Sequence, residues 1–325
     1  MPPRPLEYIY PGLVAAQALY AAVDLGLPDQ LAEGPRSAAD LAAACGAHAP
    51  TLERLLRALT TLDIFQRLPD GRYRNAPQGE LLRASHPQSL RAVARYLPAP
   101  YMLHALAQIP QSIRTGEPAF DRAFGQSFFA YLDSHPEAAA DFNRVMTLET
   151  QWVVPNLVRT FDFSRFRHLV DVAGGQGTFL REILIAVPTL RGTLFDQPQV
   201  VARAEDLSAL GARVSVAAGS FFNAVPSGGD LYSLRRILHD WSDDDARRIL
   251  DRIRAVMPPE GRLLVIEGLI DSPTHPVGLG DLMMLVLGGR ERTEADFHAL
   301  FESAAFAHVR TVPVGNYALL EARPA

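Results

Sequence analysis

The sequence predicts an α/β chain with a helical N-terminal region followed by a doubly wound, mostly parallel sheet. Three patterns lead to this prediction: short helices with one hairpin signal over residues 1–100, helical Phe-rich sequence over residues 101–160, and alternating strand-like and helical runs over residues 161–325. With 325 residues, of which 48% are hydrophobic, the chain has enough apolar material for about two domains. We therefore expect a winged-helix-like domain, a helical linker and a sheet domain with these boundaries.

Short amphipathic helices are expected in the first region. Apolar residues recur at helical spacing from Leu13 to Leu27, which predicts a buried amphipathic helix. Ser37 is a typical N-cap, with Asp40 at the third helical position behind it. Thr51 is expected to open a further apolar-striped helix.

A hairpin follows these helices. Asp70-Gly71 stands between two short β-like runs, and the order helix, helix, helix, hairpin is that of a winged helix. Residues 1–90 hold eight arginines and nine acids, a net charge of −1, which opposes the basic surface that phosphate contacts require. We expect this domain to pack against a partner chain and not to bind nucleic acid.

The linker over residues 101–160 allows two interpretations. It is either an interdomain helical segment with a buried Phe/Met stripe or one wall of an apolar pocket, and Phe128 is a candidate lining residue. Both interpretations hold together.

The last region carries five strand-like runs separated by helical segments: residues 168–173, 191–196, 212–217, 230–234 and 262–267. This alternation predicts a parallel, doubly wound sheet. Two further runs, 308–312 and 316–322, are joined by a connection so short that only an antiparallel pair is possible.

Composition excludes several kinds of chemistry. The chain holds 31 arginines and no lysine, so Schiff-base aldolases, pyridoxal phosphate enzymes, Walker-A NTPases and protein kinases are excluded. The single cysteine, Cys45, excludes structural disulfides, Cys-ligated zinc and iron–sulfur clusters. The net charge of −5 provides no basic field for nucleic acid or an anionic membrane. The N-terminus lacks a signal-peptide pattern and the run from Tyr10 to Leu27 is interrupted by polar residues, so we expect a cytoplasmic protein without a membrane span.

A Gly-rich turn follows the first strand of the sheet. The chain bends through Gly174, Gly175 and Gly177 into a helix, and glycines there permit positive φ and close approach of a ligand. The nicotinamide fingerprint G-x-G-x-x-G fails because Leu180 takes its third glycine position. The turn indicates a nucleoside-type cofactor and opposes a nicotinamide dehydrogenase.

Two further strand ends carry candidate cofactor groups. Asp196 lies about 20 residues beyond the turn, where a carboxylate accepts ribose hydroxyls; the alternative is a helix N-cap before Pro198. Phe221 or Phe222 either stacks on a purine ring or belongs to the core.

A histidine lies just beyond another strand. His239 is at the edge of the sheet where such folds bind ligands, which favours a general base over a structural histidine. Either Glu291 or Glu267 is placed to accept a hydrogen bond from its other ring nitrogen. Met283 and Met284 lie on an apolar helix, either in the core or lining a pocket.

These motifs together resemble one family. The runs DVAGGQG, FDQP, GSFF, LHDWSDDDARRIL, LLVIE and GGRERTEADF occur in the order found in the small-molecule O-methyltransferases that use S-adenosylmethionine (SAM). The look-alikes are plant caffeate and isoflavone enzymes and bacterial enzymes of polyketide, anthracycline and phenazine tailoring. The resemblance covers nearly the whole chain, and implies a Rossmann-like class I SAM methyltransferase sheet with an N-terminal winged-helix dimerisation domain.

The resemblance also implies roles for individual residues. His239 matches the general base, and Glu267 and Glu291 match the acids that orient it. A further set matches positions that hold SAM: Gly174, Gly175, Asp196, Ser220, Phe221, Arg235 and Thr150. Met146 and Met284 match methionines that sandwich an aromatic acceptor. The implied enzyme is a homodimer that methylates a phenolic hydroxyl of a small aromatic or polyketide-like natural product, releases S-adenosylhomocysteine and needs no metal.

Two positions depart from the family pattern. Ala173 replaces the first glycine of the usual run, which we expect to be a mild change, and Ser220 replaces an aspartate, which we expect to weaken SAM affinity. Neither change removes a catalytic group. Two alternatives remain: a SAM-binding relative with hydroxylase, decarboxylase or pericyclase chemistry, and a winged-helix regulator with a ligand-sensing domain.

Overall fold

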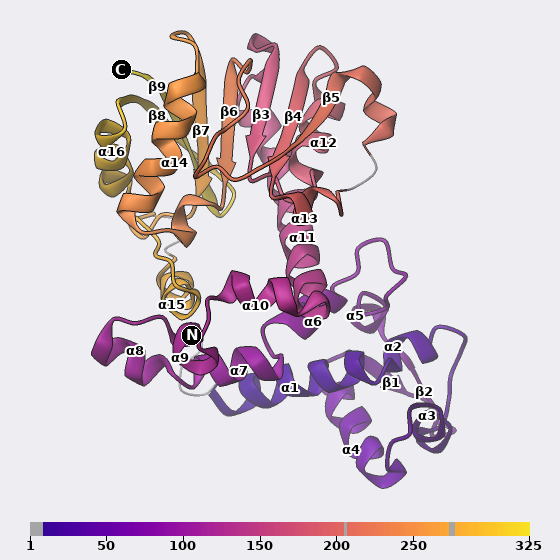
Figure 1. The fold of residues 1–325 in the computed structure, drawn as a ribbon. Helices are drawn as coiled ribbons and strands as arrows, with labels where there is room; N and C mark the ends of the chain where they lie inside the picture. Colours follow the sequence, from indigo (N-terminus) through magenta and orange to yellow (C-terminus); the bar gives the residue numbers. More distant parts are fainter. Residues whose placement is uncertain (1–8, 205–206, 273–276) are drawn as a thin grey trace. The chain divides into compact units, whose positions relative to one another are not determined.

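The computed structural model describes residues 9–204, 207–272 and 277–325, which form two compact units (Figure 1). The first unit comprises the described residues up to His104 together with His135–Val145, and the second comprises Ala105–Ser134 and the described residues from Met146 onward. Helices α7 (Pro100–Leu106) and α11 (Pro136–Thr160) contribute residues to both units. The three-part division at residues 100 and 160 stays a prediction.

The first unit consists of short helices around a small hairpin. Its elements are α1 (Ile9–Asp24), α2 (Leu27–Gln30), α3 (Ala38–Cys45), α4 (Ala49–Thr60), β1 (Phe65–Arg67), β2 (Tyr73–Asn75), α5 (Pro77–Glu80) and α6 (Arg91–Tyr96). The Ser37 side chain accepts the N–H of Asp40, and the Asp40 carboxylate accepts the N–H of Ser37. Strands β1 and β2 pair antiparallel across a turn in which Gly71 has φ +85°. The predicted N-cap and hairpin are therefore confirmed.

Two expectations for this unit were wrong in detail. The helix expected at Thr51 begins at Ala49, because Pro50 fits the first turn, where its missing N–H costs no hydrogen bond. The N-terminal helix buries Ala22 and Val23 but leaves its first half in solvent, with Tyr10 78% exposed. The other exposed apolar side chains of α1 are Ile9, Leu13 and Val14.

The Phe-rich segment forms short helices in the second unit. These are α8 (Ile109–Thr115), α9 (Ala119–Phe124) and α10 (Phe128–Ser134). Phe120 contacts Phe124 and Phe128 with ring centroids 4.7 and 5.3 Å apart, in the tilted and edge-on geometries that aromatic rings prefer. Phe128 is buried in this cluster.

A seven-stranded sheet, with the order β5-β4-β3-β6-β7-β9-β8, forms the centre of the second unit (Figure 1). Its strands are β3 (His168–Val172), β4 (Arg191–Asp196), β5 (Val214–Ala218), β6 (Leu231–Arg235), β7 (Arg262–Glu267), β8 (Phe306–Val314) and β9 (Tyr317–Pro324). Strands β3 to β7 are parallel, and β9 is antiparallel to both β7 and β8. The predicted parallel sheet and the antiparallel final pair are confirmed.

Helices cover both faces of this sheet. They are α12 (Thr178–Ala186), α13 (Pro198–Val201), α14 (Asp243–Val256) and α16 (Glu294–Ser303), whereas α15 (Gly278–Leu287) packs against α8 and α9. One core cluster joins α14 and α16 to one face, and a second joins α12 and the last turns of α11 to the opposite face. Each fully buried leucine in these clusters contributes about 1.5–3 kcal/mol.

The strand order predicts where this sheet binds a ligand. From β3 the chain winds outward through β4 and β5 and then returns to form β6 on the other side of β3. Parallel sheets of this kind bind ligands at the carboxyl ends of the two strands where the winding reverses. No helix in the described residues is long and apolar enough to span a membrane.

Candidate active site

The Gly-rich turn that follows β3 leaves no room for a side chain at Gly174, whereas Gly175 has open space around it. A Cβ on Gly174 would overlap Asp171 Oδ2 and lie 2.6 Å from Leu194 Cδ1, so only glycine fits there. Gly175 and Gly177 have φ of +60° and +86°, and Gly177 is the N-cap of α12. The turn thus presents bare backbone at the start of a helix, and its glycine N–H groups bond to the Phe195 carbonyl, the Asp196 carboxylate and the Gly174 carbonyl.

The first departure from the family pattern is less mild than expected. Ala173 adopts φ +56°, in the left-handed region that favours glycine and costs other residues roughly 1–2 kcal/mol. The prediction of a mild change was therefore wrong, because Ala173 lies in the turn beyond the end of β3 and not on the strand.

Asp196 is tied to the Gly-rich turn. Its carboxylate accepts the N–H of Gly175 at 2.8 Å and that of Gln197 at 2.6 Å. Burial raises the pKa of Asp196. The residue that caps α13 is Gln197, so the helix-cap alternative for Asp196 was wrong. Asp196 lies at the mouth of the sheet, next to the turn.

Asp171 on β3 and Arg235 on β6 each keep one buried polar atom without a partner among the described residues. Asp171 Oδ1 accepts a 2.8 Å hydrogen bond from the Ser233 hydroxyl, while Oδ2 has no partner among the described residues. Burial raises the pKa of Asp171 to about 7, although Ser233 and the Arg235 charge oppose this rise. Arg235 donates from Nη2 to Thr150 Oγ1, and its Nη1 is also unpartnered within the described residues. One acceptor atom on Asp171 and one cationic donor on Arg235 are thus left open. Asp171 was not among the predicted site residues.

The predicted adenine residues lie after β5 and pack against the core. Ser220 Oγ accepts the N–H of Phe222 at 3.3 Å. Phe221 contacts Trp241 edge-on at 5.7 Å, and Phe222 does so at 4.8 Å. Both phenylalanines are half-buried, so each has a core face and a remaining exposed part.

His239 lies in a short 3₁₀ turn, Leu238–Asp240, directly beyond β6. Its side chain is buried, and Nδ1 forms a 3.1 Å hydrogen bond with Glu291 Oε1. Nδ1 is also 3.8 Å from Glu267 Oε2, and Nε2 is 3.5 Å from Asp240 Oδ1. With Nδ1–H donated to Glu291, Nε2 is the ring nitrogen that remains to accept a proton.

Glu267 and Glu291 hold His239 in different ways. Glu267 Oε1 accepts the backbone N–H groups of Ile237 and Leu238 at 2.8 and 2.9 Å, which fixes the turn. Glu291 contacts the imidazole ring directly. The structure brings both predicted acids to the histidine.

The charge around His239 opposes the effect of burial. Burial alone lowers the pKa of the imidazole, but Glu267, Asp240 and Glu291 together raise it to about 9. Burial also raises the pKa of Asp240, to about 6. The raised pKa of His239 favours the imidazolium at neutral pH.

A second arginine lies beside these acids. Arg236 Nη1 is 3.9 Å from Glu291 Oε1, Nε is 3.9 Å from Glu149 Oε2, and the guanidinium lies over the Tyr317 ring at 5.5 Å. Arg236 has φ +57°, a strained backbone conformation for a residue other than glycine. The sequence offered only the pair Arg235-Arg236 as a signal.

Arg292 was missed although it stands inside the quoted GGRERTEADF motif. It is fully buried and donates to the carbonyl oxygens of Leu238 at 2.6 Å and Trp241 at 2.9 Å. It also forms a 2.8 Å ion pair with Asp243. Arg292 therefore holds the backbone on both sides of His239.

The two methionines predicted to contact the methyl acceptor lie on two helices of the second unit. Met146 is half-buried on α11, and its carbonyl accepts the Thr150 hydroxyl. Met284 is buried on α15, and its carbonyl accepts the N–H groups of Gly288 and Gly289. Arg290 N–H then donates to the His239 carbonyl at 2.7 Å, so the end of α15 is joined to the histidine turn.

Two family models match the chain. An O-methyltransferase domain model matches residues 106–307, and an O-methyltransferase dimerisation domain model matches residues 8–85. The first alone covers more than half of the chain.

Characterised relatives match over nearly their full length. The mitomycin biosynthesis 6-O-methyltransferase of Streptomyces lavendulae is 40% identical over 94% of this chain and 90% of its own. The 8-amino-8-demethylriboflavin N,N-dimethyltransferase of Streptomyces davaonensis is also 40% identical, over 96% of this chain and 92% of its own. Among solved structures, an O-methyltransferase from neocarzinostatin biosynthesis, in complex with SAM and 2-hydroxy-5-methyl naphthoic acid, superimposes with TM-score 0.83 at 33% identity over 96% of both chains.

Proposed function

Because the chain belongs to the O-methyltransferase family, we propose that it methylates a phenolic hydroxyl of a small aromatic or polyketide-like natural product, with His239 as general base. The observation that carries this proposal is the buried hydrogen bond between His239 Nδ1 and Glu291, which leaves Nε2 to accept a proton. SAM is the cofactor of this enzyme class, and its solved relatives hold SAM or S-adenosylhomocysteine.

The second unit is proposed to hold SAM at the carboxyl ends of β3, β4, β5 and β6. The open Asp171 Oδ2 suits an ammonium group, and the open Arg235 Nη1, next to Thr150, suits a carboxylate. Gly174 and Gly175 permit close backbone approach, Asp196 is the ribose acceptor, and Ser220 with Phe221 faces the adenine. These assignments are proposals supported by the unpartnered buried atoms.

When bound, SAM supplies an electrophilic methyl group on a sulfonium and leaves as S-adenosylhomocysteine. In its neutral form, His239 takes the hydroxyl proton of the acceptor on Nε2 as the oxygen–methyl bond forms. Glu291 and Glu267 stabilise the resulting imidazolium, as the raised imidazole pKa indicates. A base whose pKa is near that of a phenol is well matched to phenol deprotonation and contributes typically ~10²–10⁴-fold.

The acceptor is proposed to lie between apolar side chains. Met146, Met284 and Phe128 are the candidate lining residues, and Met284 is connected through the end of α15 to the His239 turn. The naphthoic acid bound by a solved relative supports an aromatic acceptor. The N,N-dimethyltransferase relative favours an aromatic amine as the second candidate acceptor.

One experiment tests the function and separates these candidates. Purified enzyme is incubated with SAM and matched phenols and anilines, and methylated product and S-adenosylhomocysteine are followed by mass spectrometry. We expect methylated phenols from wild type and a loss of ~10²–10⁴-fold in His239→Ala with SAM binding retained. Equal turnover in the variant contradicts the base role, and preferred aniline turnover selects the amine acceptor. Altered but unmethylated product without S-adenosylhomocysteine supports the non-methylating alternative.

The first unit is proposed to form a homodimer. It matches a dimerisation model, and α1 leaves Ile9, Tyr10, Leu13 and Val14 in solvent. Light scattering after gel filtration should give twice the chain mass of 35.6 kDa, and Leu13→Glu should shift the mass toward one chain. A salt-dependent shift of DNA by the wild type would instead support the regulator alternative.

A further inference from the structure

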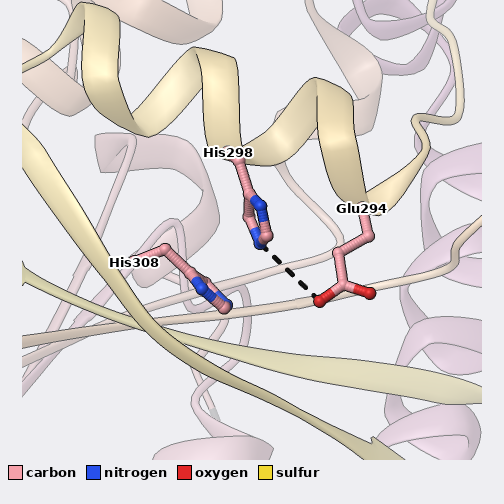
Figure 2. A group of neighbouring side chains, drawn as sticks. All are labelled: Glu294, His298 and His308. Atoms are coloured by element: carbon pink, nitrogen blue, oxygen red, sulfur yellow. Dashed lines mark ion pairs between the residues drawn. The ribbon is translucent and has the colours of Figure 1, made fainter.

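A second cluster of histidine and carboxylate side chains lies where α16 packs beside β8 (Figure 2). Glu294 and His298 are one helical turn apart on α16, and His308 is on β8. One ligand atom from each residue lies within 4.8 Å of the others. None of the three belongs to the proposed methyl-transfer site, so this cluster is independent of that function.

The geometry is near that of a metal site. His298 Nε2 is 3.6 Å from Glu294 Oε1, and the two imidazole rings lie 3.9 Å apart between centroids at 39°. Zn–N bonds of 2.0–2.1 Å in a tetrahedral site separate ligand atoms by about 3.3 Å. Small side-chain rotations would shorten the 3.6 Å separation of His298 Nε2 and Glu294 Oε1 to this value. The 41% and 37% exposure of the Glu294 and His298 side chains leaves room for these rotations.

The surroundings of the two histidines suit metal binding. The Thr311 hydroxyl contacts His308 Nε2 at 2.9 Å and orients the ring. His298 Nε2 is shielded from solvent and has no hydrogen-bond partner within the described residues.

We propose that Glu294, His298 and His308 bind one divalent transition-metal ion of the zinc class, with water completing its coordination. Two imidazoles and one carboxylate select Zn²⁺, Co²⁺ or Ni²⁺ over Ca²⁺ and Mg²⁺, which prefer all-oxygen sites. The ion would join the first turns of α16 to β8. Because α16 begins two residues after Arg292, bound metal stabilises the segment that carries Glu291 and Arg292.

Titration of the tag-free, EDTA-treated full chain tests the site. We expect calorimetry with ZnCl₂ to give one ion per chain with a dissociation constant on the order of 1 μM. Co²⁺ should give the visible absorption of a nitrogen-containing site, and saturating Zn²⁺ should raise the melting temperature by about 5 °C. His298→Ala and His308→Ala should each weaken binding by about 10- to 100-fold or more, because even the loss of an outer-shell partner costs that much.

His48→Ala is the matched control, since His48 is an exposed histidine of the first unit and should leave the affinity unchanged. SAM binding by each variant checks that the sheet domain is folded. Absence of Zn²⁺ binding by wild type, undiminished binding by the His298→Ala/His308→Ala double variant, or equal affinity for Mg²⁺ would each overturn the proposal. Because none of these measurements uses methyl transfer, failure of the metal site and failure of the proposed function are distinguishable.

Discussion

Arg292 donates a 2.6 Å hydrogen bond from Nη1 to the carbonyl oxygen of Leu238, the residue immediately before His239. Its Nη2 reaches the carbonyl of Trp241, two residues after the histidine. The rigid guanidinium fork therefore spans the turn that carries the proposed base, while neighbouring Glu291 holds the imidazole ring. The backbone and the ring of His239 are both fixed from one short segment.

We predict that Arg292→Met lowers kcat by about 100-fold, because a displacement of about 1 Å in a positioned catalytic group costs on that order. Arg292→Lys should recover only part of the loss, since an ammonium lacks the planar fork that spans two carbonyls. Rapid-quench or steady-state assays give kcat, and calorimetry gives SAM affinity, which should change little.

Arg290→Met provides the control for Arg292. Arg290 is two residues away and also pairs with Asp243, but its side chain is 48% exposed, so its removal should have little effect. A parallel loss of SAM affinity and kcat in Arg292→Met would indicate general unfolding and contradict a positioning role.

The acid cluster around His239 predicts a rate that rises with pH. The imidazole pKa is about 9 in the free enzyme, and only the neutral ring accepts a proton, so the base form increases tenfold per pH unit below 9. We expect kcat/KM for SAM, which reports the free enzyme, to rise between pH 6.5 and 9 and then to level off.

Glu291→Gln should move this profile. It removes one of the carboxylates that raise the imidazole pKa, so the midpoint should shift to lower pH, and the plateau should fall because the ring loses its charged partner. Glu302→Gln, an exposed change on α16, should leave the midpoint in place. An unchanged midpoint in Glu291→Gln would contradict the conclusion that Glu291 raises the pKa of His239.

Gly289 lies against the backbone of the histidine turn. A Cβ at this position would overlap the carbonyl oxygen of His239 and lie 3.0 Å from the Cα of Asp240. Neither backbone atom yields easily, so Gly289→Ala should displace the turn and lower kcat by about 100-fold. Gly278→Ala is the matched control, because a Cβ there meets nothing within 4 Å. Retained kcat in Gly289→Ala would show that the turn tolerates movement.

The sheet and its ligand edge were predictable because the parallel strands are short, mostly apolar runs that alternate with helical segments. His239 and Asp196 were found in this way, since their places at strand ends depend only on local pattern. The choice between Glu267 and Glu291 was not predictable. They lie 28 and 52 residues from His239, and only the folded sheet determines which carboxylate reaches the ring.

Other parts of the site had weaker signals. The Arg292 guanidinium donates hydrogen bonds to backbone carbonyl groups. Residue types alone do not indicate which carbonyl groups an arginine will contact. The positive φ of Ala173 and Arg236 depends on how the chain leaves the sheet, and not on their own preferences. His308 joins Glu294 and His298 only through the packing of β8 beside α16.

The buried carboxyl of Asp171 predicts that SAM affinity depends on pH. Burial raises its pKa to about 7, and the proposed ammonium partner favours the ionised form. Below pH 7 the carboxyl is increasingly protonated in the free enzyme, so the dissociation constant for SAM should increase by up to tenfold per pH unit, and above pH 7 it should be nearly constant. Calorimetry from pH 5.5 to 8 measures this.

Asp171→Asn should weaken binding at pH 8 and remove the pH dependence, whereas exposed Asp251→Asn should retain it. A wild-type affinity that is constant over this range, or a slope that persists in Asp171→Asn, would mean that Asp171 does not contact the cation.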